Sequence, residues 1–527
     1  MQHLLSAGVT NSATVWITIP MLICFFALMI GVGFYCRKHA TNVDGFVLGG
    51  RSVGPWLTAF AFGTSYFSAV IFVGYAGQFG WNFGLASTWI GLGNAFIGSL
   101  LAWIVLGRRT RVMTQHLGSK TMPDFFEKRY NSPALKIIAS VIVFIFLIPY
   151  TASLYNGLSS LFNNVFKIDY WIIVLVMAVL TGIYVIFGGY MATAINDFIQ
   201  GIIMLVGISA VVIAVLGQNG GLVEAVKTLN KTEGAKFTSA FGPQPIFLLV
   251  VVLLTSLGTW GLPQMVGKFY SIKDQSSIKK GTIISTVFAV IVAGGCYFLG
   301  GFGKLYFADI KAAGFITQND TVVLYDKVIP TMLSNLAPII VALIIVLVLS
   351  ASMSTLSSLV LTSSSTLTLD VVKPAIEKKK KVSDKKSILI LRLFIVFFIA
   401  VSAVIAILKD SIWQDSVFIA QMMGVSWGAL AGSFLAPFLY GLYWKKTTRA
   451  AVISSFIFGT GIEIIQLIIG VCTIKPQNAI LDFIFTNSLY SGVFAMLGGL
   501  IIVPIVSLLT AKKKIENIEE KFSCYNK

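Results

Sequence analysis

Charged residues are scarce in this sequence. Only 11% of its 527 residues are Asp, Glu, Lys or Arg, whereas 56% are apolar. An ordinary soluble domain carries about 25% charged residues, so the composition excludes a soluble enzyme and a disordered scaffold. Long apolar stretches with little charge are instead typical of a polytopic membrane protein, whose helices cross the bilayer several times.

Cysteine and histidine are also few, and neither forms a metal-binding pattern. The sequence has five cysteines and three histidines. The cysteines show no CxxC pair or zinc-like spacing and the histidines do not cluster, so we expect no disulfide framework and no transition-metal site. Because no nucleophile with a base and no paired carboxylates are evident, we expect neither an enzyme nor an organic cofactor.

Basic residues outnumber acidic ones and give a formal net charge of +18. They stand in short clusters between apolar stretches rather than along one soluble face, so we expect no nucleic-acid partner. Two runs, residues 378–381 and 512–514, consist entirely of lysine. We expect these runs to be solvated and to contact anionic membrane lipids.

Thirteen apolar runs predict an all-α fold with about 13 transmembrane helices, because a helix needs about 20 residues to cross the hydrocarbon layer. The first run is too long for the apolar part of a signal peptide, so we interpret it as a retained membrane anchor. The odd number of crossings places the two termini on opposite sides of the membrane. The runs lie near residues 14–36, 53–77, 80–106, 135–165, 169–190, 193–216, 245–268, 281–303, 331–370, 389–408, 412–443, 450–472 and 488–510.

The distribution of Lys and Arg predicts the orientation, because cytoplasmic loops carry the positive excess. An external N-terminus places 30 of these residues, Lys268 among them, in the cytoplasmic loops and tail, and leaves nine outside. We therefore expect a multi-pass protein of the cell membrane with an external N-terminus and a cytoplasmic C-terminus.

Two of the apolar runs are interrupted by glycine and polar residues. The second run contains the stretch 62–65, FGTS, and the seventh contains 255–263, TSLGTWGLP. Each interrupted run opens a block of five runs, and because five is odd the second block enters the membrane in the opposite direction. This pattern predicts an inverted repeat with a binding site near the midplane, between the two broken helices.

The predicted organisation of the chain follows from these blocks. It comprises an N-terminal extra helix and loop (1–52), the first five-helix repeat (53–216), an extracellular loop (217–244), the second five-helix repeat (245–443), two C-terminal helices (444–510) and a cytoplasmic tail (511–527).

Hydroxyl side chains crowd the middle of the ninth run. At 3.6 residues per turn, Ser354, Ser357 and Ser358 share one helix face, and Thr355 lies beside it. Hydroxyl oxygens are hard ligands that suit a small alkali cation. The alternative is that each hydroxyl bonds a carbonyl group of its own helix, which is frequent in membranes.

Other oxygen ligands are available nearby. Carbonyl groups freed at the first break, near Thr64 and Phe67, could coordinate Na⁺, because unwound backbone does so in transporters. Glu463, in the twelfth run, is expected to make a protonated or packing contact.

Five short motifs follow one another along the chain in an order that resembles one family. They are LGGRS at 48–52, GTSYFSA at 63–69, TMPDFF at 121–126, the glycine pair 188–189 leading to DFIQG at 197–201, and MSTLS at 353–357. Together they resemble the sodium:solute symporter family over residues 46–443.

The resemblance implies a leucine-transporter-type 5+5 inverted repeat with one extra helix before it and two after it. It also implies a sodium site made by the carbonyl groups of Thr64, Phe67 and Ala351 and the hydroxyl groups of Ser354 and Thr355. The family match places Asp197, near the start of the sixth run, on a helix that packs near these residues, where it could hold a second Na⁺ with Ser354, Ser357 and Ser358. The alternative is that Asp197 caps its helix or guides Na⁺ release. The sodium/proline members are the most similar. They have an aspartate where this chain has Tyr66 and a tryptophan where it has Thr255, which leaves the substrate open.

We predict a secondary active symporter that couples inward Na⁺ movement to uptake of a small organic solute, with an amino acid such as proline favoured. Na⁺ is the coupling ion. The alternatives are a proton-coupled carrier, with Asp197 or Glu463 as the proton site, and a sodium symporter for a sugar, a monocarboxylate or a vitamin. The predicted solute-binding residues are Ser65, Tyr66, Ser68, Tyr150, Ser153, Thr255, Gly258 and Trp260.

Overall fold

The computed structural model describes residues 12–166, 168–306, 325–334, 336–412, 418–472, 474, 476–485, 487–511 and 515–526. Within these ranges the protein is helical and has no β-strand; a single bridge pairs Val53 with Ile272. The lysine run 512–514, which we expect to contact anionic lipids, lies outside the described residues. The all-α prediction is confirmed.

The α-helices are numbered α1 to α24 in chain order. Their bounds are α1 Ser12–Cys36, α2 Val43–Leu48, α3 Pro55–Tyr66, α4 Ala76–Phe83, α5 Thr88–Gly93, α6 Arg108–His116, α7 Met122–Tyr130, α8 Pro133–Phe166, α9 Tyr170–Gln218, α10 Leu222–Glu233, α11 Ala235–Thr238, α12 Pro245–Leu257, α13 Pro263–Tyr270, α14 Gln275–Ala289, α15 Gly295–Gly300, α16 Val328–Ser334, α17 Pro338–Thr366, α18 Lys373–Glu377, α19 Asp384–Ile412, α20 Phe418–Tyr443, α21 Arg449–Val471, α22 Ala479–Phe485, α23 Ser488–Leu509 and α24 Ile518–Phe522.

Ten helical segments of the described chain are long and apolar enough to cross a membrane, or eleven if the bent pair α12 and α13 counts as one crossing. Two of the ten, Val70–His116 and Tyr170–Gln218, contain 47 and 49 residues. At 1.5 Å per residue each would be about 70 Å long, more than twice the hydrocarbon thickness. Each contains a glycine with non-helical backbone, Gly84 (φ 60°, ψ −139°) and Gly189 (φ 55°, ψ −148°). The predicted count of thirteen depends on dividing both segments at these glycines.

Both predicted helix breaks are present. In the first, α3 ends at Tyr66, Phe67 is extended (φ −93°, ψ 122°), and the helix resumes with a π-helical turn, Val70–Tyr75, that leads into α4. In the second, α12 continues as a tight turn, Gly258–Gly261, and Leu262 is extended (φ −83°, ψ 120°) before α13. Proline at position 263 explains this break, because its ring excludes the preceding residue from helical backbone angles. The two halves of the second broken helix are bent by 46°.

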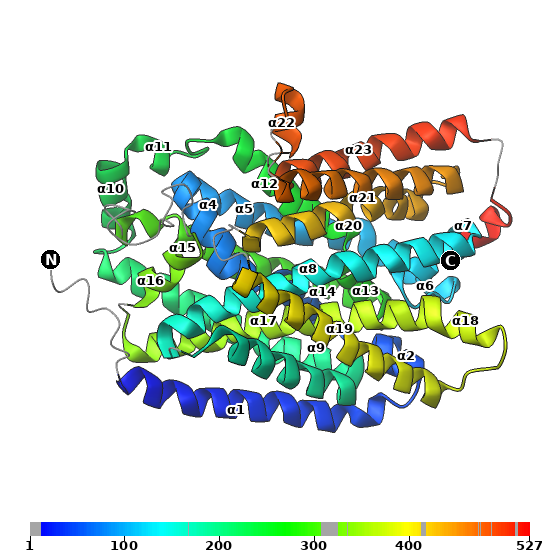
Figure 1. The fold of residues 1–527 in the computed structure, drawn as a ribbon, viewed down its shortest axis with the longest axis horizontal. Coiled ribbons are helices and arrows are strands. Elements are labelled where there is room, and N and C mark those ends of the chain that lie inside the picture. The colour runs from blue at the N-terminus through cyan, green and yellow to red at the C-terminus, as the bar shows by residue number, and fades with distance from the viewer. Residues whose placement is uncertain are drawn as a thin grey trace.

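The hydroxyl-rich helix α17 lies at the centre of the bundle. It packs against α9, α8, α1, α19 and the first broken helix α3. Figure 1 shows α20, α21 and α23 stacked on the opposite side of the molecule from α1. The long helices run between two ends of the molecule, one carrying α10, α11 and α16 and the other carrying α6, α7 and α18 (Figure 1).

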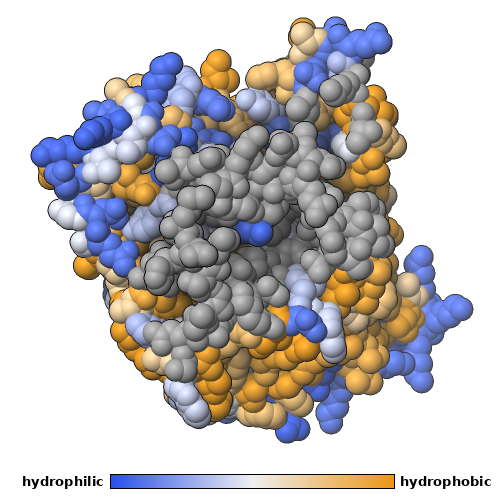
Figure 2. All heavy atoms as spheres, turned by 60° about the vertical axis from the view of Figure 1, so that its left-hand side comes forward, coloured by the Kyte–Doolittle hydropathy of each residue, from blue (hydrophilic) through white to orange (hydrophobic). Residues whose placement is uncertain are grey.

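Large apolar side chains cover the flanks of this bundle. Trp16, Ile213, Ile457 and Leu509, from four different helices, are each more than 65% exposed. Figure 2 shows apolar residues gathered over the lateral surface. Water would not favour so much exposed apolar area, whereas lipid does.

The end of the chain packs against the end of the molecule that carries α6 and α7. Lys521 of α24 donates to the carbonyl oxygen of Arg129 at 3.3 Å, and Tyr525 donates to that of Arg109 at 3.1 Å. The described C-terminal segment therefore connects α6 with α7.

Candidate functional site

Five oxygen atoms converge where the first break meets α17. The Thr355 hydroxyl lies 3.3 Å from the carbonyl oxygens of both Thr64 and Phe67 and 3.1 Å from that of Ala351. The Ser354 hydroxyl lies 3.2 Å from the Thr64 carbonyl and 3.1 Å from the Ala351 carbonyl. All five residues are buried. We call this group the oxygen cluster.

The oxygen cluster has more acceptors than hydrogens to satisfy them. Thr355 approaches three carbonyl oxygens, but a hydroxyl has one hydrogen to donate. The separations also exceed the usual 2.7–2.8 Å of O–H···O bonds. Oxygen ligands at about 2.4 Å from a hard cation, set at right angles, are about 3.4 Å apart. Hydroxyls bonded only within their own helix would not need the carbonyls of α3, so the arrangement suits a cation.

Two of the residues predicted to hold a second sodium ion, Asp197 and Ser358, contact a buried lysine. Lys268, on α13, donates to Ser358 at 2.9 Å and lies 3.4 Å from a carboxylate oxygen of Asp197. The Ser357 hydroxyl donates to the carbonyl of Ser354 in its own helix at 2.9 Å. The Ser358 hydroxyl also bonds Ser65, a predicted solute-binding residue, at 2.8 Å.

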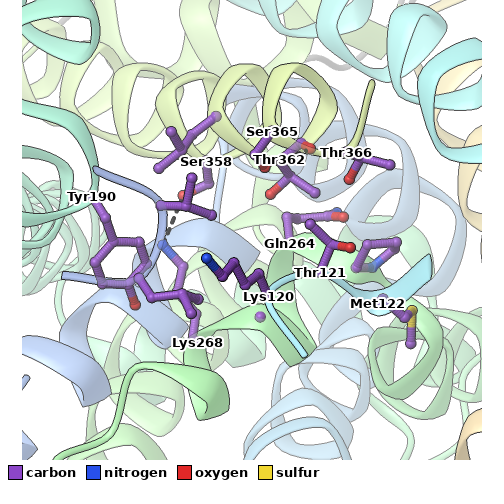
Figure 3. A pocket seen from close by; sticks show the side chains of 15 residues that line it. Lys120, Thr121, Met122, Tyr190, Gln264, Lys268, Ser358, Thr362, Ser365 and Thr366 are labelled. Atoms are coloured by element: carbon purple, nitrogen blue, oxygen red, sulfur yellow. Dashed lines mark hydrogen bonds between the residues drawn. The ribbon is translucent and has the colours of Figure 1, made fainter. Parts of the chain in front are cut away.

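A cleft leads to this lysine from the end of the molecule that carries α6 and α7. Figure 3 shows Lys268 bonded to Ser358, with Lys120, Tyr190 and Gln264 around them. Lys120 pairs with Asp44 at 2.9 Å, where α2 approaches the loop before α7. Both polar atoms of the Gln264 amide are buried without a partner in the part of the chain that the structure describes.

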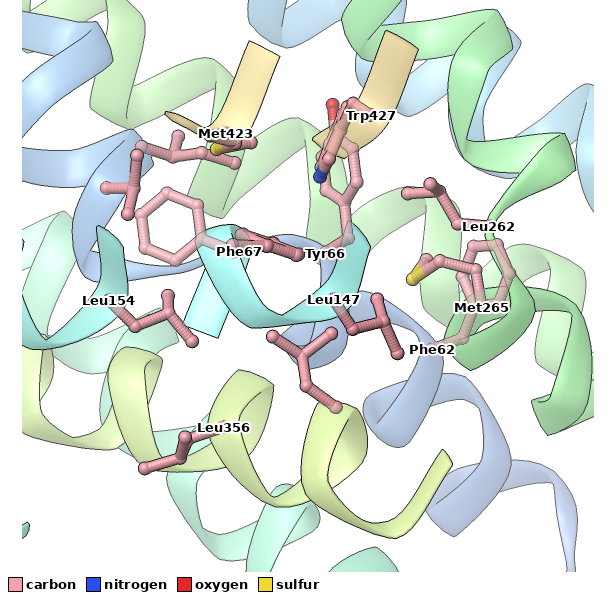
Figure 4. Packing of buried hydrophobic residues seen from close by; sticks show 14 of the residues in the cluster. Phe62, Tyr66, Phe67, Leu147, Leu154, Leu262, Met265, Leu356, Met423 and Trp427 are labelled. Carbon is pink, nitrogen blue, oxygen red and sulfur yellow. The ribbon is translucent and has the colours of Figure 1, made fainter. Parts of the chain in front are cut away.

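Three aromatic side chains meet on the other side of the first break. The rings of Tyr66 and Tyr150 each lie 6.0 Å from that of Trp427, and Tyr150 meets it edge-on. Ser68 lies beside Tyr150. We call these four residues the aromatic cluster. Figure 4 shows Tyr66 at the break, with Trp427 on α20 above it.

Three polar atoms of the aromatic cluster are buried and make no close hydrogen bond in the part of the chain that the structure describes. They are the hydroxyls of Ser68 and Tyr150 and the indole nitrogen of Trp427, and Ser68 and Trp427 both lie next to the Tyr150 hydroxyl. Buried polar groups are ordinarily paired, and an unpaired one requires an explanation. Three together beside a broken helix fit a place for a polar ligand.

The other predicted solute-binding residues point elsewhere. The hydroxyl of Thr255 donates to Asn94 at 3.0 Å, and the indole of Trp260 donates to the carbonyl of Ile97 at 3.0 Å. Ser153 donates to the carbonyl of Tyr150 at 2.7 Å. Gly258 packs towards α20 and α23. The second break reaches the aromatic cluster through its backbone, because Tyr66 donates to the carbonyl of Thr255 at 3.1 Å.

Two residues of the site were missed in the sequence. Lys268 closes the seventh apolar run and was counted among the loop bases, but its side chain is buried. Lys268 could have been identified from the sequence, because it is a charged residue on the half-helix that follows the break at Pro263. Trp427 lies inside an apolar run, where nothing local distinguishes it from a packing residue.

A broken helix whose carbonyl oxygens join a buried group of hydroxyls, in contact with a second broken helix, is typical of secondary transporters. Residues 46–459 match the sodium:solute symporter family. The chain belongs to this family and is a sodium-coupled symporter of a small solute, not an enzyme.

One curated relative and two solved structures are similar to this chain. The chain is 31% identical over 505 residues to the sodium/proline symporter of Staphylococcus aureus strain NCTC 8325, covering 94% of this chain and 93% of that protein. A Na⁺-coupled sialic acid symporter has a similar fold, with a TM-score of 0.71 at 17% identity, covering 94% and 98% of the two chains. A manganese transporter of Eremococcus coleocola also matches, with a TM-score of 0.53 at 13% identity, covering 87% and 95%. The predicted leucine-transporter-type fold is confirmed.

Proposed function

We propose that this symporter carries a small amino acid with an apolar side chain into the cell, and that proline is the first solute to test. The proposal rests on the aromatic cluster, in which the polar side-chain atoms of Ser68, Tyr150 and Trp427 make no close hydrogen bond within the described chain. It is supported by the similarity of 94% of the chain to sodium/proline symporters.

The first break offers complementary groups to both charged groups of an amino acid, its carboxylate and its ammonium group. The helix that resumes after Ser68 presents N–H groups without intrahelical partners, which favour a carboxylate. The end of α3 presents further carbonyl groups besides that of Thr64, and the C-terminal end of a helix favours an ammonium group. The rings of Tyr66, Tyr150 and Trp427 would enclose an apolar side chain. Because backbone groups would bind both charged groups of the solute, the pocket does not require the aspartate that sodium/proline symporters have in place of Tyr66.

The oxygen cluster is the proposed site of the coupling Na⁺. It shares the first break with the aromatic cluster, so ion and solute would order the same unwound segment. One charge moving through a 100 mV potential provides about 2.3 kcal/mol, which sustains about fifty-fold accumulation of the solute.

The proposed orientation places the N-terminus outside and the C-terminus in the cytoplasm. The loop between α18 and α19, which contains the lysine run 378–381, would then face anionic lipid on the cytoplasmic side. In this orientation the cleft of Figure 3 opens to the cytoplasm and forms part of the exit route.

A ligand screen tests the proposed solute class. The purified protein in Na⁺ is expected to unfold several °C higher with proline or another small apolar amino acid, because a ligand at 100 times its Kd stabilises the fold by about 2.7 kcal/mol. The same screen contains a sugar, a monocarboxylate and a vitamin. Stabilisation by one of these and by no amino acid would contradict the proposed class. Replacement of Na⁺ by choline should weaken the shift.

Glu463 bears on the alternative of proton coupling. It is buried among α20, α21 and α23, and one of its carboxyl oxygens accepts from Ser491 at 3.0 Å. We propose that Glu463 has a packing role. Glu463→Gln, which keeps the shape and removes the titratable group, is expected to leave Na⁺-driven uptake within about twofold of wild type, because a packing amide can make the same contact.

Uptake measured in Na⁺ and in choline medium, each with and without a pH gradient, checks this expectation. The packing role fails if Glu463→Gln stops uptake while the protein still reaches the membrane. Uptake by the wild type that follows the pH gradient in choline would favour the proton-coupled carrier.

A further inference from the structure

We infer that the ammonium group of Lys268 is a built-in cation that takes the place of a second sodium ion, so that the carrier moves one Na⁺ with each solute. This inference rests on the proposed sodium coupling at the oxygen cluster. It concerns a separate position, the one that Asp197 and Ser358 share.

The side chain of Lys268 is buried and surrounded by groups that stabilise a cation. The side chains of Lys268 and Asp197 are 4% and 0% exposed. The ammonium group lies 3.4 Å from the carboxylate, 2.9 Å from the Ser358 hydroxyl and 5.4 Å from the centre of the Tyr190 ring. A carboxylate, a hydroxyl oxygen and an aromatic face are all partners that stabilise a cation.

A sodium ion would need the same oxygens. Asp197 and Ser358 supply the carboxylate and one hydroxyl of the expected second site, and both already face Lys268. The third residue, Ser357, directs its hydroxyl to the carbonyl of Ser354. A second cation placed beside Asp197 would meet the like charge of Lys268 at close range, so ammonium and Na⁺ exclude each other.

The lysine also connects the position to the moving parts of a transporter. Asp197 lies on α9, Ser358 on α17 and Lys268 on α13, which is the second half of a broken helix. Ser358 extends the chain of contacts to Ser65 of the first break at 2.8 Å. Lys268 and Ser358 together therefore link both broken helices to α9 and α17 without an added ion.

The cleft makes it possible to test whether Na⁺ can replace the ammonium group beside Asp197. It reaches Lys268 and Ser358 from the surface, so shortening Lys268 would open a route by which Na⁺ could reach Asp197. The other oxygen of Asp197 has no partner among the described residues and would be available to the ion.

Equilibrium binding of radioactive ²²Na⁺ to the purified full-length protein tests the inference directly. Wild type and Lys268→Arg are expected to bind one Na⁺ per chain. Lys268→Ala is expected to bind two, and Lys268→Ala combined with Asp197→Asn is expected to bind one again. Reversal potentials in proteoliposomes should give one Na⁺ per solute for wild type, and two for Lys268→Ala if that variant transports.

Each result decides between defined alternatives. Two Na⁺ bound to wild type would overturn the role of Lys268 and leave the proposed sodium coupling intact. One Na⁺ bound to a folded Lys268→Ala variant would also overturn it. No Na⁺ bound to wild type would instead contradict the oxygen cluster. Because two Na⁺ bound to wild type would overturn the inference without any variant, it stays testable if Lys268→Ala does not fold.

Discussion

Removing either hydroxyl of the oxygen cluster is expected to raise the Na⁺ concentration for half-maximal uptake by about tenfold or more. The variants are Ser354→Ala and Thr355→Val. Each removes one of five converging oxygens, and an interaction with a charged group contributes about 1.5–3 kcal/mol, or roughly tenfold to a hundredfold in affinity. Uptake measured against Na⁺ concentration at fixed membrane potential provides the comparison.

Ser357→Ala is the matched control for these variants. It makes the same change on the same helix, but the Ser357 hydroxyl donates to a carbonyl of its own helix. We expect its Na⁺ dependence to stay within about twofold of wild type. Normal Na⁺ dependence in both Ser354→Ala and Thr355→Val, at normal expression, would remove the oxygen cluster as the coupling site.

Changes in the aromatic cluster are expected to weaken solute binding by about tenfold or more. Tyr150→Phe removes one hydroxyl that lacks a partner within the described chain, and Trp427→Phe removes the indole nitrogen while keeping an aromatic ring. Each substitution leaves a polar group of the bound solute buried without its partner, which costs about 1–3 kcal/mol of binding free energy. The KM for the solute should rise, and the Na⁺ dependence at saturating solute should change little.

Trp260→Phe separates the aromatic cluster from the second break. The Trp260 indole donates to the carbonyl of Ile97, so its removal is expected to affect the packing of that helix more than solute preference. If Trp260→Phe alters solute preference as strongly as Trp427→Phe, the pocket extends to the second break as predicted from the sequence. If Tyr150→Phe and Trp427→Phe both leave the KM and the solute preference unchanged, the aromatic cluster is not the solute site.

Features of single helices were predictable from the sequence. The second break follows from Pro263, whose ring restricts the residue before it, and the shared face of Ser354 and Ser358 follows from helix geometry. The hydroxyl groups of α17 indicated a binding site even before the helix was known to be buried. An apolar run with so many hydroxyl groups already differs from a lipid-facing helix. The family resemblance then added the carbonyl of Ala351.

Features that depend on two helices meeting were not predictable in the same way. Asp197 and Lys268 are 71 residues apart, and no periodicity shows that their side chains face each other. Counting Lys268 as a loop base treated its charge as solvated, whereas tertiary packing buries it. The sequence did not show which way the hydroxyl of Thr255 points, and in the structure the rotation of α12 directs it to Asn94.

The most direct test of the central claim is uptake of the solute that the ligand screen identifies into proteoliposomes, with an inside-negative potential and equal pH on both sides. Sodium coupling predicts accumulation that requires external Na⁺, disappears when choline replaces it, and approaches about fifty-fold at 100 mV with equal Na⁺ on both sides. Equal accumulation in choline, or uptake that never exceeds equilibration in Na⁺, would contradict it.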